Sequence, residues 1–507
     1  MVVGYCVGEI SLSELTFISD KMPQVGEYVI VEYDSKKVLG MVESLVRGND
    51  ALNIDLHDVE AIQTIARIGG KDYYIKGKVK LLGDVNDDLR LPRTPALPGT
   101  PIKLADKEIL NDVFKVKNPI KLGTLVNQSD IEVNVEANPV LNRHLAILAM
   151  TGAGKSNTVA VLIDQLLGYN VPVFVFDMHG EYRDAKFPNG NVNVIQPKIN
   201  PQYMTFYEIK RLVSIPNSAV IQERFFRQAF NKAQKMIRES TAHTSDFLQL
   251  IVDILYKDVE YDEEGNISTK TDKRIIDVIN KVEDSMDKYS NLFDSNKGNI
   301  LTSIKIGHAN VLDLSQTDES VAEVLVSHIM RNSLQRRKNA VHGSSNDTLD
   351  HPVFYIIEEA HILAPNKRDS QSKHWIQRVA REGRKFGLGL CLVSQSPKTV
   401  DHDALSQMNN MIILRLVEPE DQRHVQSASE SLSRDLIDQL PSLNVGEAIV
   451  LGLMTKVPTL VKINEFKGRR TGGDLDIIGE LANFNKKEDD ELKRQEQEMD
   501  DLGCYDY

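Results

Sequence analysis

The 507-residue sequence has few cysteines, no basic excess and no long apolar run. Its three cysteines (Cys6, Cys391 and Cys504) lie far apart without Cys-x-x-Cys or Cys/His spacing. This argues against a disulfide framework and a zinc site, and it favours a reducing cytosol. No stretch approaches the roughly 18 continuous apolar residues of a membrane span. The first residues, MVVGYCVGEISLSEL, lack the basic leader and apolar core of a secretory signal. We therefore expect a cytoplasmic protein without a membrane partner.

The charge balance is also one-sided, because 73 acidic residues outnumber 60 basic ones and give a formal net charge of −13. A protein that simply coats nucleic acid is expected to be basic. If this chain handles DNA, its positive charge must be concentrated locally, for example in a channel. The length leaves room for about three domains.

The first hundred residues carry short β-branched runs, such as EYVIVEY and YYIKGKVKLLG, separated by glycines and polar turns. This spacing predicts a small barrel or sandwich over residues 1–100. The stretch RLPRTPALPGTP (90–101) contains four prolines and is typical of a linker. We assign residues 101–139 to a segment that links this domain to the next.

From about residue 140, near-continuous apolar strands alternate with helical periodicity, which indicates a mainly parallel α/β sheet covered on both faces. The predicted core covers residues 140–202 and 306–465. An all-helical insertion (203–305) interrupts it, and a charged tail (466–507) follows. The candidate strands of the core are 143–150, 171–177, 308–315, 353–361, 388–396 and 410–416.

The segment ILAMTGAGKSNT (147–158) places glycines and a lysine directly after a buried strand and before a helix. In a P-loop, backbone N–H groups surround phosphates, the lysine reaches the β and γ phosphates, and Ser/Thr binds Mg²⁺. The pattern predicts ATP and Mg²⁺ binding, although Ala149 stands where the general pattern has glycine. The alternative is a glycine-rich turn with a chance lysine. The predicted binding residues are Thr151, Gly152, Ala153, Gly154, Lys155, Ser156 and Asn157.

The strand VFYIIEEAH ends in two carboxylates, which suits a metal–nucleotide site. We assign Glu358 to the Mg²⁺ shell and Glu359 to the attacking water. Ordinary exposed acids at a strand end are the alternative.

Two further polar residues end neighbouring strands. Asp177 in VFVFDMHGEY is expected to support the metal or the water, because open parallel sheets bind ligands at this edge. His179 and Glu181 equally fit a role that only shapes the turn. Gln395 in LCLVSQS is expected to sense the γ-phosphate, with a polar strand cap as the alternative.

Basic residues gather in NKRDSQSKHWIQRVAREGRKFG (366–387), where seven lysines and arginines face two acids. An arginine before the next strand suits a finger that enters a neighbouring subunit's ATP site, and the other cations suit a DNA backbone. A solvated amphipathic helix is the alternative.

Four of these stretches together resemble the HerA branch of the HerA–FtsK ATPases: RHLAILAMTGAGKSN, VFVFDMHGEY, FYIIEEAH and AREGRKFGLGLCLVSQSP. The match covers about 140–463, and the β-rich start resembles the family's HAS barrel. The resemblance implies a RecA-like P-loop ATPase core and a hexameric ring that translocates double-stranded DNA. It also implies action with a NurA-type nuclease in end resection during recombinational repair.

The resemblance also implies roles for single residues. Arg143 is similar to the family's arginine that touches nucleotide in the same chain. Arg384 resembles the finger that acts on a neighbour, with Arg381 as second choice. Lys462 and Ile463 lie in a strand similar to the one that folds back against the nucleotide.

Two other functions remain open. One is an ATP-switched scaffold that assembles and activates a partner nuclease with little translocation. The other is a secretion or conjugation motor of the same superfamily, against which the lack of a membrane span counts.

Overall fold

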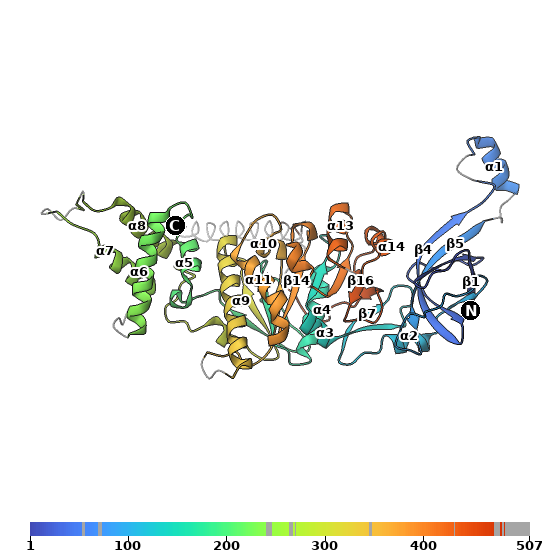
Figure 1. Ribbon diagram of the computed structural model, residues 1–507, viewed down its shortest axis with the longest axis horizontal. Coiled ribbons are helices and arrows are strands. Elements are labelled where there is room, and N and C mark those ends of the chain that lie inside the picture. The colour runs from blue at the N-terminus through green and yellow to red at the C-terminus, as the bar shows by residue number, and fades with distance from the viewer. Residues whose placement is uncertain are drawn as a thin grey trace, which may run out of the picture.

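The computed structural model contains an N-terminal barrel, a large sheet with covering helices, and a helical unit at the end opposite the barrel (Figure 1). The structure describes residues 1–52, 56–68, 73–239, 246–262, 267–268, 270–343, 347–429, 431–470, 477–478 and 481. Much of the predicted charged tail (466–507) therefore lies outside the described residues. Within the described part, no helix is long and apolar enough to cross a membrane.

The barrel closes through six antiparallel strands, and this confirms the predicted small β-barrel. The last strand lies beyond the predicted boundary at residue 100, because Ile102 is fully buried and its strand pairs with both the first and the third. The domain therefore ends after Leu104. In barrel order the strands are β1 (Val2–Val7), β2 (Glu14–Ser19), β5 (Tyr74–Asp84), β4 (Lys36–Gly48), β3 (Tyr28–Tyr33) and β6 (Pro101–Leu104).

The large sheet has eleven strands, of which the first seven in sheet order pair in parallel and the rest pair antiparallel. Two antiparallel strands, β7 and β8, come from the segment expected to be a linker. In sheet order the strands are β11 (Asn191–Ile195), β12 (His308–Asp313), β10 (Val173–Asp177), β13 (Val353–Ile357), β14 (Leu388–Ser394), β9 (Leu145–Leu148), β15 (Asn410–Leu414), β16 (Glu447–Gly452), β17 (Thr459–Ile463), β7 (Pro119–Leu125) and β8 (Glu132–Glu136).

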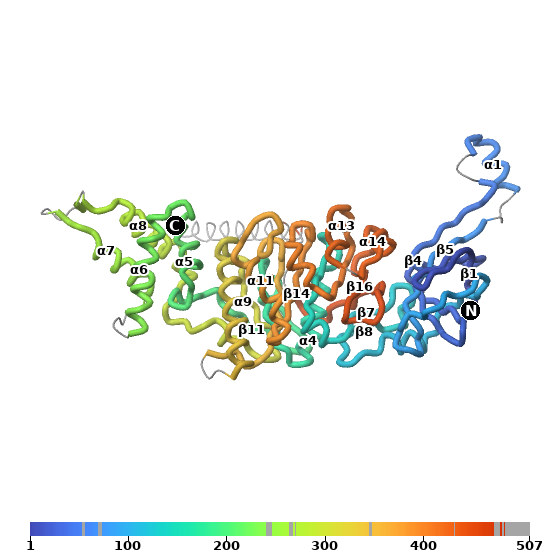
Figure 2. The backbone as a smooth tube through the Cα atoms, viewed as in Figure 1, coloured from blue at the N-terminus to red at the C-terminus, as the bar shows by residue number. Residues whose placement is uncertain are grey.

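Every residue of the central strands β9, β10, β13, β14 and β15 is buried, so both faces of the sheet are covered, as their apolar sequences require. Helices α9 and α11 lie side by side in Figure 2 and pack against each other. The helices outside the insertion are α1 (Val59–Ile68), α2 (Lys107–Val113), α3 (Ala137–Arg143), α4 (Lys155–Leu167), α9 (Glu319–Val341), α10 (Ala360–Leu363), α11 (Gln371–Glu382), α12 (His402–Leu405), α13 (Pro419–Ala428) and α14 (Arg434–Ile437).

Between β11 and β12 the chain forms a helical unit whose apolar faces pack together, at the end of the molecule opposite the barrel (Figure 1). Its helices are α5 (Phe206–Leu212), α6 (Val220–Arg238), α7 (Phe247–Tyr256) and α8 (Lys273–Lys288). Short 3₁₀ turns complete the chain at η1 (Pro201–Tyr203), η2 (Ile300–Ser303), η3 (Gly383–Phe386), η4 (Pro397–Thr399) and η5 (Leu440–Ser442).

The barrel shares an apolar core with the sheet. Tyr28 of β3 is buried within this shared core, where its ring meets Phe114 edge-on with centroids 5.9 Å apart. Its hydroxyl donates to the backbone carbonyl of Pro458 at 3.0 Å and lies 3.1 Å from the Thr459 hydroxyl. The barrel is thus joined to the strand that leads back to the P-loop edge of the sheet.

We expect Tyr28→Ala to destabilise the whole chain by about 3–5 kcal/mol, because it leaves a cavity in the shared core. Tyr28→Phe should cost about 1 kcal/mol through the lost hydrogen bond. Urea denaturation followed by fluorescence of Trp375, the single tryptophan, reports on the core. Tyr5→Ala, at a barrel position that is 55% exposed, is the control. An unchanged Trp375 transition in Tyr28→Ala would show that barrel and core unfold independently.

Candidate active site

The loop after β9 has the backbone of a phosphate-binding loop. Gly152 and Gly154 have φ of +77° and +103°, a conformation that disfavours residues with a Cβ. Gly154 is also the N-cap of α4, where the first N–H groups of a helix have no partner within the helix. Ala149 differs because its N–H donates to the carbonyl of Ser394 at 3.2 Å and its φ is not positive. Glycine is therefore not required at position 149.

Lys155 begins α4 and forms an ion pair with Glu359, whose Oε1 lies 2.5 Å from Nζ. Gln395, just after β14, donates to the same oxygen at 3.0 Å and accepts from the hydroxyl of Thr151 at 2.7 Å. These contacts join the P-loop, the β13 end and the β14 end into one network. The structure thus brings Thr151, Lys155, Glu359 and Gln395 together, as the sequence predicts.

Two histidines flank the carboxylate of Glu359, which itself has φ of +45°. His361 Nδ1 lies 3.2 Å from Oε2, and His179 Nε2 lies 3.5 Å from Oε1. Burial alone would raise the pKa of Glu359, but the hydrogen bond with His361 and the charge of Lys155 hold it at about 2. Glu359 is therefore ionised at neutral pH, as a proton acceptor must be.

Glu358 has a different environment from its neighbour. Its Oε1 accepts a hydrogen bond from the Tyr182 hydroxyl at 2.9 Å, while Oε2 is buried and has no hydrogen-bond partner among the described residues. Burial raises the pKa of Glu358 to about 8, against the lowering effect of Lys155. A cation bound beside Glu358 would stabilise its ionised form and contact the oxygen that has no hydrogen-bond partner.

Asp177 supports the turn after β10. Its two oxygens accept from the backbone N–H groups of residues 179–182, at 2.9 Å for both Gly180 and Tyr182. The carboxylate thereby positions Tyr182, which in turn contacts Glu358. The expected contact of Asp177 with metal or water stays a prediction.

The predicted return of the chain to the nucleotide site is visible at the end of β17. The N–H of Ile463 donates to the carbonyl of Gly446 at 2.8 Å, and the N–H of Gly446 donates to the carbonyl of Ala153 in the P-loop at 3.0 Å. Lys462 Nζ donates to the carbonyl of Val445 at 2.6 Å. Asn157 of α4 binds the following segment through Asn464 O at 2.8 Å and Phe466 N at 2.9 Å.

Arg143, Arg381 and Arg384 lie near the amino ends of the parallel strands, whereas the P-loop lies at their carboxyl ends. Arg143 precedes β9 and Arg384 precedes β14, whereas the P-loop follows β9. The two strands are parallel, with Cys391 opposite Leu145. The length of β9 separates Arg143 from the carboxyl ends of the strands by about 13 Å, and the length of β14 separates Arg384 from them by about 20 Å. Arg143 and Arg384 thus lie near the amino ends of their strands, away from the P-loop, and the contact of Arg143 with nucleotide in its own chain stays a prediction.

Most cations of the basic segment 366–387 have partners within the fold, so the segment as a whole does not offer free charge to DNA. Lys367, Arg384 and Lys385 have no ion pair among the described residues. The paired cations are Arg368 with Glu323, Lys373 with Asp401 at 3.3 Å, Arg378 with Glu382 at 3.1 Å and Arg381 with Asp403 at 3.3 Å.

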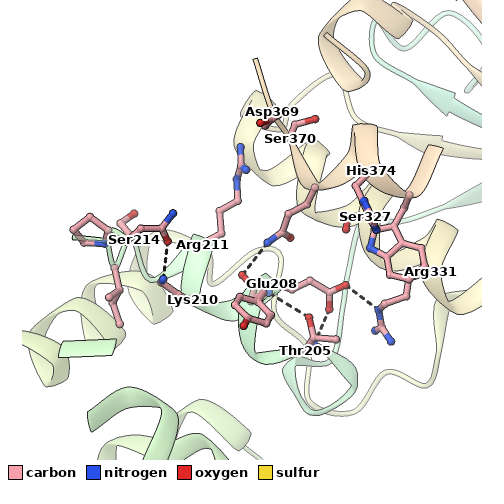
Figure 3. A pocket seen from close by; sticks show the side chains of 16 residues that line it. Thr205, Glu208, Lys210, Arg211, Ser214, Ser327, Arg331, Asp369, Ser370 and His374 are labelled. Atoms are coloured by element: carbon pink, nitrogen blue, oxygen red, sulfur yellow. Dashed lines mark hydrogen bonds and ion pairs between the residues drawn. The ribbon is translucent and has the colours of Figure 1, made fainter. Parts of the chain in front are cut away.

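A hollow of about 860 Å³ lies away from the P-loop, between the base of the insertion and helices α9 and α11 (Figure 3). Its cations are balanced by acids, because Arg331 meets Glu208 at 3.2 Å and Lys210 meets Glu223 at 2.5 Å. Thr205 caps α5 here by accepting from the N–H of Glu208. The hollow is therefore a neutralised junction between insertion and core and does not suit phosphates.

Sequence reasoning missed four residues around the site. His361 and Tyr182 lie inside quoted motifs, and their proximity to the carboxylates was the available signal. Gly446 and Asn464 had no signal, because antiparallel pairing through β16 and β17 brings them to the loop.

The chain matches three family models: the HerA helicase central domain over residues 120–333, the HAS barrel domain over 3–87 and the HerA-like C-terminal domain over 345–492. It is 39% identical to the DNA double-strand break repair helicase HerA of Saccharolobus solfataricus, covering 96% of this chain and 97% of that one. The chain belongs to the HerA helicase family.

A probable helicase of Methanocaldococcus jannaschii is 41% identical to this HerA-family chain, over 99% of both chains. Among solved structures, VirB4 of Thermoanaerobacter pseudethanolicus aligns at 15% identity with a TM-score of 0.48, over 69% of this chain and 98% of that one. As a HerA-family member the protein is an ATPase of the helicase class, and the network around Lys155 and Glu359 is its candidate catalytic centre.

We expect Lys155→Ala to abolish ATP hydrolysis without unfolding the protein, because the lysine neutralises phosphate charge and contributes little to the core. Glu359→Gln should still bind ATP but hydrolyse it about 10²–10⁴ times more slowly, since proton acceptance is lost. Binding is measured with a fluorescent ATP analogue and hydrolysis by phosphate release.

The matched control is Glu465→Gln, which removes an exposed carboxylate near the same edge and should leave both measurements unchanged. Loss of ATP binding in Glu359→Gln, together with normal hydrolysis in Glu358→Gln, would show that the two carboxylates have the opposite roles.

Proposed function

We propose that this protein is an ATP-dependent, hexameric double-stranded DNA translocase that acts with a NurA-type nuclease in DNA end resection during recombinational repair. The observation that carries the proposal is the separation of the P-loop from Arg143, Arg381 and Arg384 at opposite edges of one sheet. The names of the relatives, DNA double-strand break repair helicases, support the cellular role. Because a repair helicase must reach the DNA, we propose that this protein is located in the cytoplasm.

An ATP site whose P-loop and arginines lie at opposite ends of the strands favours head-to-tail assembly of subunits. If the arginine edge of one subunit faces the P-loop edge of the next, each contact is heterologous, and a closed rotation gives a ring. The resemblance to HerA–FtsK ATPases supports six subunits. Arg384 then supplies the cation for the charge that develops in phosphoryl transfer, whereas Arg143 contacts the nucleotide of its own chain.

In each site, the ion pair between Lys155 and Glu359 is the group that ATP must rearrange. The phosphate oxygens accept hydrogen bonds from the N–H groups of the P-loop and of the α4 N-terminus. Lys155 then turns from Glu359 to the phosphates. Glu359 is then free to hold the attacking water and accept its proton. Gln395, which contacts both Thr151 and Glu359, couples the loop to the proton acceptor.

Mg²⁺ is proposed as the metal of the site, where it would neutralise phosphate charge. Ser156 and Glu358 are the residues that would hold it, because Glu358 has an unsatisfied buried oxygen. The described residues contain no cluster of three or more His, Cys, Asp or Glu side chains suited to a metal. This agrees with the usual binding of Mg²⁺ by one or two protein groups, water and phosphates.

We expect Arg384→Ala to bind ATP and assemble, but to hydrolyse ATP about 10³–10⁵ times more slowly. Mixed rings of Arg384→Ala and Lys155→Ala subunits should regain part of the activity, since an intact P-loop can then face an intact arginine. Phosphate release is measured on mixtures whose composition is verified by native mass spectrometry.

Lys385→Ala is the matched control, because Lys385 is the exposed neighbour of Arg384 and has no ion pair in the described structure. Normal hydrolysis by Arg384→Ala alone would transfer the role to Arg381 or remove the finger from the mechanism. Absence of recovery in verified mixed rings would contradict action on a neighbour.

The alternative function, an ATP-switched scaffold for a nuclease, differs in its need for hydrolysis. We expect Glu359→Gln, which binds ATP, to fail in nuclease-coupled resection of long duplex DNA, and ATP hydrolysis by the wild type to rise with duplex length. Resection is measured by loss of end-labelled DNA with purified partner nuclease. Full resection by Glu359→Gln would favour the scaffold and contradict translocation.

A further inference from the structure

A second hollow, of about 500 Å³, lies beside β11, the outermost strand of the large sheet. One wall is β11 and the residues after it, and the other is the segment 297–305, which includes η2. The side-chain amide of Asn193 donates to the carbonyl of Ser303 at 2.8 Å and holds the two walls together. The hollow is therefore a fixed feature of the fold.

The charge of this hollow is of one sign. Lys198, Lys297 and Lys305 line it, and no acidic side chain does. Across the described ranges, none of the three lysines forms an ion pair or a side-chain hydrogen bond. This contrasts with the hollow of Figure 3, where Lys210 and Arg331 are paired with acids. In a chain of net charge −13, three unpaired cations around one hollow are a local exception.

The uncharged groups of the hollow are also suited to an oxyanion. Gln196, Asn299 and Ser303 add polar side chains to its lining. Because β11 is the last strand of its sheet, the N–H groups on its outer side have no strand partner in the described structure. Lysine ammonium groups and amide donors together are the groups that bind phosphate.

We propose that this hollow binds phosphate groups of the DNA backbone. The proposal rests on the proposed function and names a site at which an acidic protein binds DNA. Contacts with phosphates supply the sequence-independent part of DNA binding. The hollow also adjoins the base of the insertion. Asn200 donates to the carbonyls of Ser295 at 2.8 Å and Lys297 at 3.3 Å, which joins the segments that carry Lys198 and Lys297.

The test is duplex DNA binding by the full chain between about 50 and 200 mM salt. The variant Lys198→Gln/Lys297→Gln/Lys305→Gln should reduce the slope of log K against log salt by about 2–3, at about 0.9 per lost phosphate contact. The control Lys76→Gln/Lys232→Gln/Lys257→Gln removes the same charge from scattered exposed lysines and should change the slope by less than about 1. ATP hydrolysis without DNA should be the same in all three proteins.

Equal slopes in the two triple variants would overturn the proposal. Self-association of the hollow variant with an unchanged slope would show that the lysines only prevent the edge strand from pairing. If the wild type binds no duplex, the proposed function fails, and the hollow is tested with inorganic phosphate by ³¹P line broadening. Broadening that the hollow variant abolishes would assign the site to small phosphates, whereas its absence would exclude the site altogether.

Discussion

The common direction of the parallel strands is the constraint on which the candidate site depends. Strands that run the same way place all their carboxyl ends at one edge, so the P-loop, Glu358, Glu359 and Gln395 must meet there. The same constraint sends every residue that precedes a strand to the opposite edge. The phosphate-binding loop and Arg384 therefore lie at opposite ends of the strands within one chain.

The ion pair of Lys155 and Glu359 shows how the resting site stays stable. Each group is nearly removed from water, and a buried charge without a partner is costly. Pairing them satisfies both while no phosphate is present, with His361, His179 and Gln395 supporting the carboxylate. Under the proposed function, ATP competes with Glu359 for the lysine and releases this carboxylate.

The sequence predicted the fold class from its alternating strands and helices, and it predicted that the glycine-rich loop, Glu359 and Gln395 meet because each follows an apolar strand. It could not foresee that Arg368 and Lys373 are paired, because Glu323 and Asp401 are distant in sequence. Gly446 contacts the P-loop because of antiparallel strand pairing, which no local sequence pattern predicts.

The shared core between barrel and sheet has a mechanical consequence. Tyr28 inserts beneath the segment that leads into β17, and Glu43 of β4 accepts from Ser433 next to α14 at 2.8 Å. The barrel is therefore attached to the ATPase sheet through a buried core and hydrogen bonds as well as through the connecting chain. Helix α1 lies at the tip of the extension formed by β4 and β5, beyond the barrel (Figure 1). Under the proposed function, a protein bound to the barrel would therefore be in mechanical contact with the ATPase sheet.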